Sequence, residues 1–528
     1  MVKSGLRGLG AEDLLALLPC LVPLMRHEVK CDSAPLVRAL MQISVKSVAL
    51  ATQLYWFLAV HAEESEFGES YKRWQEELLL CVKGDASKDL VATRDFVLAF
   101  RSTEDPQADP SPKAFPNLDA KPSPDPLPNL TSQADPEMRI EKLMVAFNDA
   151  HLTGDGKSIP LLTRPKERVV QVKMDEARVI ESATLPVIVP CVCASGRTQS
   201  IMYKKDDLQK DVLVMGAIRI MKVILQQAGI VAPLTTYSIL ATSSTDGFIE
   251  IVKESQTLYA LQQEGSLKDR LVQCARITGK QLDAVQDRFM RSVAAYCVVT
   301  YLLGIGDRHL DNLMLAPSGE LFHIDFSFVL GRDAKPLMPP MRLSNDMVEA
   351  MGGEMSIPYR AFHQVCEQIF LCLRRRPSFF ATLLLALVPD SSTDNVSDWE
   401  FNIDDLHREI VHRFMPGLSD PEAASEFRKR IDDSALFSVA EAVSDMVRHV
   451  KKQGVVGQVA EVGWSWLRPA VSAFSVLASS ASDPEASQYP GEVHKRVSDP
   501  GTARPPEPRP DSPFGNAMSE PPPGMDTQ

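Results

Sequence analysis

The sequence predicts an α+β fold with a strand-rich lobe followed by a helical lobe, and with a further helical region before both. Residues 11–101 place apolar side chains at helical spacing, residues 159–255 have the pattern of short strands around one long helix, and residues 282–452 are again mainly helical. The chain has 528 residues, of which 45% are hydrophobic, so it holds enough apolar material for two or more cores.

The N-terminal region is expected to be a partial helical-repeat domain over residues 1–102. Its helical periodicity is clearest in Asp13–Met25, Ala34–Ala62 and Tyr71–Val82. Prolines then recur among Asp, Ser and Asn, a composition that buries too little apolar surface to order. Residues 103–158 are therefore expected to be a disordered linker.

The strand-rich lobe is expected to span residues 159–255, and the helical lobe residues 256–452. The expected strands are Arg168–Val172, Ala177–Ile180, Val187–Val192, Ser200–Tyr203, Tyr237–Ala241 and Gly247–Val252. One helix over Leu213–Ala228 interrupts them, and short strands around Leu313 and Phe322 lie within the helical lobe.

After the helical lobe, residues 453–478 predict an amphipathic extension with Trp464 and Trp466, which either anchors at a lipid interface or packs on protein. Residues 479–528 predict a disordered tail. No stretch reaches the roughly 20 uninterrupted apolar residues of a membrane-spanning helix. We therefore expect a soluble or peripheral protein.

The composition excludes two other classes of protein. A net charge of −13 argues against general nucleic-acid binding, which depends on Lys and Arg neutralising phosphates. The nine cysteines are scattered, and the closest pair, Cys191 and Cys193, lacks the spacing of a structural zinc site. This pattern fits a reducing compartment.

The segment Gly304–Asn312 (GIGDRHLDN) lies between an apolar helix and an apolar strand, as a catalytic loop would. Asp325 ends a later strand, so its carboxylate and the Asn312 amide have the oxygen atoms to share Mg²⁺. Phosphoryl transfer needs such ligands, a cation on the phosphates and an acceptor for the hydroxyl proton. A buried polar network is the alternative interpretation, but the joint spacing of Asp307, His309, Asn312 and Asp325 favours catalysis.

The segments GDRHLDNLML and HIDF resemble the phosphatidylinositol 3- and 4-kinase family, and LGRDAKPLMPPMRL after them is similar to its class III 3-kinases of the vacuolar-sorting type. The resemblance covers residues 159–452 and, more loosely, 22–82. It implies a two-lobed, protein-kinase-like catalytic domain behind a truncated α-helical domain. The implied activity is transfer of the ATP γ-phosphate to the 3-hydroxyl of phosphatidylinositol, giving phosphatidylinositol 3-phosphate for endosomal sorting and autophagy.

The resemblance also implies roles for single residues. Either Asp307 or His309 accepts the proton of the lipid hydroxyl, and Arg308 holds the loop by pairing with an internal acid. Asn312 and Asp325 hold Mg²⁺, with Mn²⁺ as the alternative ion. The implied ATP-binding residues are Ser182, Lys204, Asp211, Tyr237, Glu250 and Val252. Two alternatives stay open, because Lys205 competes with Lys204 for the phosphates and a tyrosine such as Tyr237 is often a core residue.

The loop after Asp325 is expected to select the lipid. Its cations Arg332, Lys335 and Arg342 suit a phosphatidylinositol headgroup with one phosphodiester. Ser327 stands where the family has glycine, and its Cβ is expected to restrict the backbone and reduce activity.

The resemblance implies partners and a location as well. These are phosphatidylinositol membranes, a protein-kinase-like regulatory scaffold subunit, no nucleic acid, and a cytoplasmic protein peripheral on endosomal or autophagic membranes. Two other functions stay open: a phosphatidylinositol 4-kinase or protein kinase of the same family, and an inactive scaffold that binds membranes or a partner.

Overall fold

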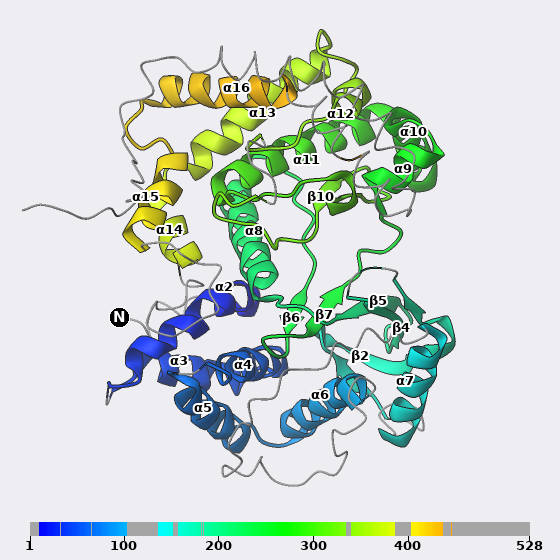
Figure 1. Cartoon of the computed structure of the whole chain (residues 1–528), viewed down its shortest axis with the longest axis vertical. Coiled ribbons are helices and arrows are strands. Elements are labelled where there is room, and N and C mark those ends of the chain that lie inside the picture. The colour runs from blue at the N-terminus through cyan, green and yellow to red at the C-terminus, as the bar shows by residue number, and fades with distance from the viewer. Residues whose placement is uncertain are drawn as a thin grey trace, which may run out of the picture. The chain divides into compact units, whose positions relative to one another are not determined.

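The computed structural model of the chain describes residues 10–102, 136–150, 157–333, 339–385 and 403–436 with Asp445, apart from the single residues 32, 65, 181 and 183. The chain divides into two units, Met1–Gly454 and Val455–Gln528, and all described residues belong to the first. The predicted extension 453–478 and tail 479–528 lie outside the described residues. Within the described part, a helical region, a strand-rich lobe and a helical lobe follow one another, which confirms the predicted α+β class (Figure 1).

The N-terminal helices are α2 (Ala11–Leu24), α3 (Pro35–Ser44), α4 (Val48–His61), α5 (Gly68–Cys81) and α6 (Asp85–Ser102). Helix α4 is apolar around nearly its whole circumference, the pattern of a helix enclosed on all sides. It packs against α2, α3, α5, α6 and strands β2 (Arg164–Val172) and β6 (Ile239–Ala241). The helical region is therefore built into the strand-rich lobe.

Helix α7 (Pro136–Ala150) corrects the expectation of a continuous linker over residues 103–158. Leu143 and Phe147 lie four residues apart and so share one face of the helix, and both are buried. The Phe147 ring is 4.9 Å from that of Phe96 on α6. This apolar face gives the segment a surface on which to fold. Residues 103–135 and 151–156 lie outside the described part.

The strand-rich lobe is an antiparallel sheet of seven strands in the order β1-β2-β4-β5-β7-β6, with β3 paired to β4. Besides β2 and β6, its strands are β1 (Ile159–Leu161), β3 (Arg178–Val179), β4 (Val187–Cys193), β5 (Thr198–Lys204) and β7 (Gly247–Glu250). Each lies within or overlaps a predicted strand, except β1. Between β5 and β6, helix α8 (Gln209–Gln227) begins at Gln209 rather than at the predicted Leu213.

Side chains of α6 enter the same core as the central strands. The Phe100 ring lies 5.1 Å from the rings of Tyr203 on β5 and Phe248 on β7. At the end of α6, Arg101 donates to both carboxylate oxygens of Asp246, at 2.6 and 2.7 Å. Tyr203 donates to the same carboxylate at 3.1 Å, so α6 is fixed to the strand that ends at Lys204.

The helical lobe contains α9 (Leu258–Glu264), α10 (Leu267–Thr278), α11 (Leu282–Leu303), α12 (Asn345–Ala350), α13 (Ile357–Leu373), α14 (Pro377–Leu385), α15 (Ile403–Arg413) and α16 (Asp420–Leu436). It also holds a small antiparallel sheet in the order β10-β9-β8, made by β8 (Gln256–Thr257), β9 (Leu313–Leu315) and β10 (Leu321–His323). Helix α11 is buried continuously from Ser292 to Leu303 and is the core of this lobe.

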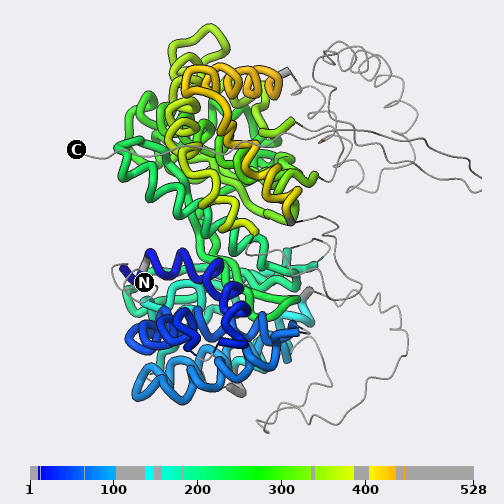
Figure 2. The backbone as a smooth tube through the Cα atoms, turned by 90° about the vertical axis from the view of Figure 1, so that its left-hand side faces the viewer, coloured from blue at the N-terminus to red at the C-terminus, as the bar shows by residue number. Residues whose placement is uncertain are grey.

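The two lobes are joined by α8, which packs on α2 and β6 and also on α13 and α14. Figure 2 shows the division from the side: the N-terminal helices and the sheet (blue and cyan) lie together, and the later helices (green to orange) form the other lobe. No helix in the described part is both long and apolar enough to cross a bilayer.

Candidate active site

The predicted catalytic loop begins where α11 ends at Gly304, whose φ of 58° is the left-handed conformation that glycine adopts without strain. Its carbonyl accepts from the Gly331 N–H at 2.9 Å, and the Gly306 N–H donates to Phe328 O at 2.9 Å. A Cβ at Gly304 would collide with Gly331, and one at Gly306 with Arg332 O. These glycines therefore let the loop lie directly against the segment that follows Asp325.

Arg308 connects the same two segments from inside. Its guanidinium donates to Gly306 O at 2.7 Å, to Ile324 O at 2.9 Å and to Asp325 O. It also lies 5.5 Å from the centre of the Phe326 ring, within range of a cation–π interaction. Arg308 does hold the loop, but its partners are backbone carbonyls rather than the acidic side chain that we expected.

Asp307 and His309, the two candidate proton acceptors, lie next to each other. His309 Nε2 is 3.6 Å from Asp307 Oδ2, and His309 is buried while Asp307 is partly exposed. Asp307 has a φ of 50°, and its backbone is held on both sides: its N–H donates to Asp333 Oδ2 at 2.9 Å, and its carbonyl accepts from Asn312 Nδ2 at 3.0 Å. The geometry makes them a pair, and the choice of base stays open.

Asp325 and Asp211 come together from the two lobes. Asp211 lies in the first turn of α8, and its Oδ1 accepts the N–H of Phe326 at 2.9 Å, although 115 residues separate them. Burial, with the negative charge of Asp325, raises the pKa of Asp211 to about 7. The α8 carboxyl therefore fixes the backbone that carries Asp325.

Lys204, at the end of β5, completes this group. Its Nζ is 2.5 Å from Asp206 Oδ2. Burial alone favours the neutral amine, but the bond to Asp206 and the charges of Asp325 and Asp211 raise the pKa of Lys204 above its usual value. Lys205 is exposed, so the structure favours Lys204 as the cation that interacts with Asp325.

Asp325 itself is kept ionised by its neighbours. Burial raises its pKa, but the hydrogen bond from the Ser327 hydroxyl and the charges of Lys204 and Arg308 outweigh burial and hold the pKa below the usual value. A carboxylate and an ammonium group are thus both charged where the two lobes meet.

Asn312 and Asp325 fit the divalent cation that phosphoryl transfer requires. Asn312 donates through Nδ2, which leaves its Oδ1 to accept. Asp325 accepts both hydrogen bonds from Ser327 through Oδ1, which leaves Oδ2. Hard divalent ions prefer such oxygen ligands and often take the remainder from substrate phosphates. Among the described residues, no group of three or more His, Cys, Asp and Glu side chains is placed to hold a metal.

The other residues that we expect to bind ATP differ in their surroundings. Tyr237 is buried and its hydroxyl donates to His323 O at 3.3 Å, which favours the core alternative. The Glu250 carboxylate is occupied by the Ser238 N–H at 3.0 Å and by an Arg164 guanidinium at 2.5 Å. The Val252 N–H donates to no described residue, so it is available to donate to adenine. Ser182 lies exposed in a bend before β4. Their contacts with ATP stay predictions.

The cations expected to meet the lipid do not share one environment. Arg332 is partly exposed, and Lys335 lies outside the described residues. Arg342 is 5% exposed, and its guanidinium is 2.7 Å from Asp445 Oδ2. The prediction that Arg342 binds the headgroup is therefore wrong, because its charge is buried and already paired inside the fold.

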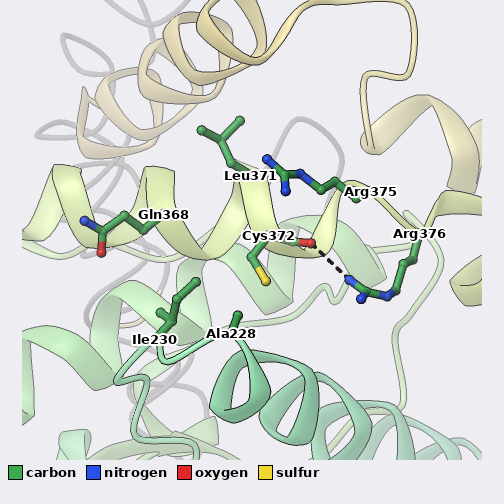
Figure 3. A pocket seen from close by; sticks show the side chains of 7 residues that line it. All are labelled: Ala228, Ile230, Gln368, Leu371, Cys372, Arg375 and Arg376. Atoms are coloured by element: carbon green, nitrogen blue, oxygen red, sulfur yellow. Dashed lines mark hydrogen bonds between the residues drawn. The ribbon is translucent and has the colours of Figure 1, made fainter.

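A separate cavity of about 520 Å³ lies between the end of α8 and α13 (Figure 3). It is lined by Ala228, Ile230, Gln368, Leu371, Cys372, Arg375 and Arg376. None of the predicted site residues is in this set, so the cavity is distinct from the candidate active site.

Two contacts of the site were not foreseen from the sequence. In one, the Asp307 N–H donates to the Asp333 carboxylate. In the other, the Ser327 hydroxyl donates to the Asp325 carboxylate. Asp333 lies in the segment already singled out for its cations, so its acidic side chain was the available signal. For Ser327 the signal was its place two residues after an Asp, whose carboxylate commonly accepts the backbone N–H at that position and so lies near the side chain there.

Comparison with known proteins identifies a family to which the residues around this site are similar. Residues 198–397 match the family model described as "Phosphatidylinositol 3- and 4-kinase". Phosphatidylinositol 3-kinase pik3 of Schizosaccharomyces pombe is 31% identical over 450 residues, which are 81% of this chain and 53% of that protein. Phosphatidylinositol 3-kinase VPS34 of Arabidopsis thaliana is 29% identical over 443 residues, 81% of this chain and 52% of that protein.

The VPS34 protein of Saccharomyces cerevisiae is 33% identical over 283 residues, 53% of this chain and 32% of that protein. The chain spans about half the length of the first two relatives. The matched range contains Lys204, Asp211, Asp307, His309 and Asp325. Through residues 198–397, this chain belongs to the phosphatidylinositol 3- and 4-kinase family.

Proposed function

We propose that the chain is a phosphatidylinositol 3-kinase, which transfers the γ-phosphate of ATP to the 3-hydroxyl of phosphatidylinositol. The observation that carries the proposal is the convergence of Lys204, Asp211 and Asp325 beside a loop that presents Asp307 and His309. The relatives that match most of this chain bear the name phosphatidylinositol 3-kinase, which supports the 3-position.

In this proposal, the charged groups bind and orient the nucleotide. Lys204 places a positive charge on the phosphates, and the Val252 N–H binds the adenine edge. Asn312 and Asp325 would hold Mg²⁺, with Mn²⁺ as the alternative ion, which would supply positive charge to the phosphate oxygens. Asp211 keeps the backbone of Phe326 in place, which fixes the position of Asp325.

The loop residues act on the lipid hydroxyl. Its oxygen forms a bond to the γ-phosphorus as the bond from that phosphorus to the bridging oxygen of ADP breaks, and its proton passes to the Asp307–His309 pair. Since Arg308 ties this loop to the backbone at Asp325, the proton acceptor and the metal ligand are held as one unit. Such fixed placement is the chief means of catalysis in phosphoryl transfer.

Arg332 and Lys335 remain the proposed contacts for the phosphodiester of the headgroup. Binding of a protein-kinase-like regulatory subunit, and a cytoplasmic location on endosomal or autophagic membranes, are proposed on the VPS34 names of two relatives.

The test uses the full chain, Mg²⁺-ATP and vesicles that contain phosphatidylinositol, with the position of the transferred phosphate determined by chromatography of the deacylated product. We expect the 3-phosphate, and transfer about 10²- to 10⁴-fold slower from His309→Ala. A 4-phosphate or a phosphorylated protein would identify another activity of the family. ATP binding without any transfer would identify an inactive scaffold.

A further inference from the structure

The turn Asp325–Ser327 holds its own carboxylate. Asp325 Oδ1 accepts the Ser327 hydroxyl at 2.6 Å and the Ser327 N–H at 3.3 Å. Asp325 has a φ of 60°, whereas Ser327 is not among the described residues with positive φ. The expectation that the Ser327 Cβ strains the backbone is therefore wrong, because the left-handed residue of the turn is Asp325.

Other groups already hold the backbone of this turn. Arg308 donates to the Asp325 carbonyl, and Asp211 accepts the N–H of Phe326, whose ring is fully buried. The Ser327 side chain is exposed, and its hydroxyl donates to the Asp325 carboxylate. Its hydroxyl thus acts on the orientation of the Asp325 side chain rather than on the path of the chain.

The backbone N–H bond is available to any residue other than proline at position 327, but the hydroxyl bond needs Ser or Thr. A hydroxyl that donates to a carboxylate makes a short, strong hydrogen bond. Held this way, the carboxylate has one oxygen engaged and one left to bind an ion. Groups that orient a metal ligand in this manner commonly change metal affinity by 10- to 100-fold when they are removed.

We propose that Ser327 is a positioning residue of the metal site, whose hydroxyl makes Asp325 bind the divalent cation through one oxygen. The proposal rests on the function proposed above, in which Asp325 is a metal ligand. Binding through one oxygen suits Mg²⁺, which demands octahedral geometry, more than Ca²⁺, which readily takes both oxygens of a carboxylate. Ser327 therefore also favours Mg²⁺ over Ca²⁺.

The experiment measures the binding of a non-hydrolysable ATP analogue to the full chain by calorimetry, without lipid, in Mg²⁺ and separately in Ca²⁺. For Ser327→Ala we expect about tenfold weaker binding in Mg²⁺ and a smaller change in Ca²⁺, so that the ratio of the two constants falls. Ser327→Thr, which keeps the hydroxyl, should keep the wild-type ratio.

Ser195→Ala is the matched control, because the Ser195 hydroxyl donates to the Glu167 carboxylate at 3.0 Å on an exposed turn between β4 and β5. It should behave as the wild type. Ser327→Gly provides a second deletion of the hydroxyl should Ser327→Ala fail to fold. If the wild type binds the analogue and both deletions keep its Mg²⁺ to Ca²⁺ ratio, the role of Ser327 is refuted. A wild type that binds no analogue in Mg²⁺ contradicts the proposed function instead.

Discussion

Arg342 and Asp445 form a buried ion pair, 2.7 Å between Nη2 and Oδ2, with side chains only 3% and 7% exposed. It joins the end of the loop after Asp325 to a residue beyond α16. A charge in such surroundings is stable only with its partner, so removal of one member leaves the other uncompensated.

We therefore predict that Arg342→Met lowers the free energy of unfolding by about 3–5 kcal/mol, the usual cost of breaking a buried pair. Combining it with Asp445→Leu should restore most of the loss. Urea unfolding measures the stability of the single and the double variant.

Arg332→Ala is the comparison, and it should raise KM for phosphatidylinositol vesicles with little change in stability. If Arg342→Met instead keeps the wild-type stability and raises KM for phosphatidylinositol vesicles, Arg342 contacts the headgroup after all.

The raised pKa of Asp211 predicts that the stability of the fold depends on pH. Its pKa of about 7 in the fold exceeds the ordinary value of about 3.9, so the folded chain holds this proton more tightly than the unfolded chain. The free energy of unfolding should therefore fall as pH rises from about 4 to about 7. Asp211→Asn keeps an oxygen for the Phe326 N–H but removes this titration. Urea unfolding without nucleotide, at pH 5 and pH 8, should show the variant gaining stability relative to wild type at the higher pH, and an unchanged difference would contradict the raised pKa.

His309→Ala should lower kcat by about 10²- to 10⁴-fold while the dissociation constant of ATP stays close to that of the wild type. Single-turnover transfer to phosphatidylinositol and calorimetric ATP titration separate the two effects. The loss of kcat in Asp307→Asn, measured in the same assay, shows which of Asp307 and His309 contributes more to turnover. His412→Ala, at an exposed position on α15, is the control and should keep the wild-type kcat.

Gly306→Ala should slow turnover and lower the free energy of unfolding by about 1–3 kcal/mol, since overpacking costs that much. Its Cβ would collide with Arg332 O and come within 2.8 Å of Asp333 Oδ2, which accepts the Asp307 N–H. Gly417→Ala is the matched control, because nothing lies within 4 Å of a Cβ there. Equal stability of the two variants would show that the loop is not packed as described.

Local patterns were sufficient for the parts of the fold that depend on near neighbours. The periodicity of α11 and the residues from Asp307 to Asp325 located the candidate catalytic loop and its carboxylate, since the chain between them is short. The Asp325 turn was misjudged, because which residue adopts a left-handed φ depends on contacts such as those of Arg308.

Long-range pairing accounts for the remaining differences. Arg342 was assigned to the lipid because it lies beside Arg332 and Lys335 in sequence, while its partner is 103 residues away. Helix α7 was missed because its apolar face is short and gains its stability from α6. No local pattern contains either contact.

The packing of α6 on the sheet limits how far the chain can be truncated from its N-terminal side. The family match begins at residue 198, yet Tyr203 and Phe248 lie against Phe100, and Asp246 against Arg101. A chain shortened to the matched residues would expose these rings and leave the Asp246 carboxylate without its cation, next to the strand that ends at Lys204. The boundary of the family match is thus not a boundary of autonomous folding, and the smallest unit that retains the intact candidate site includes α6.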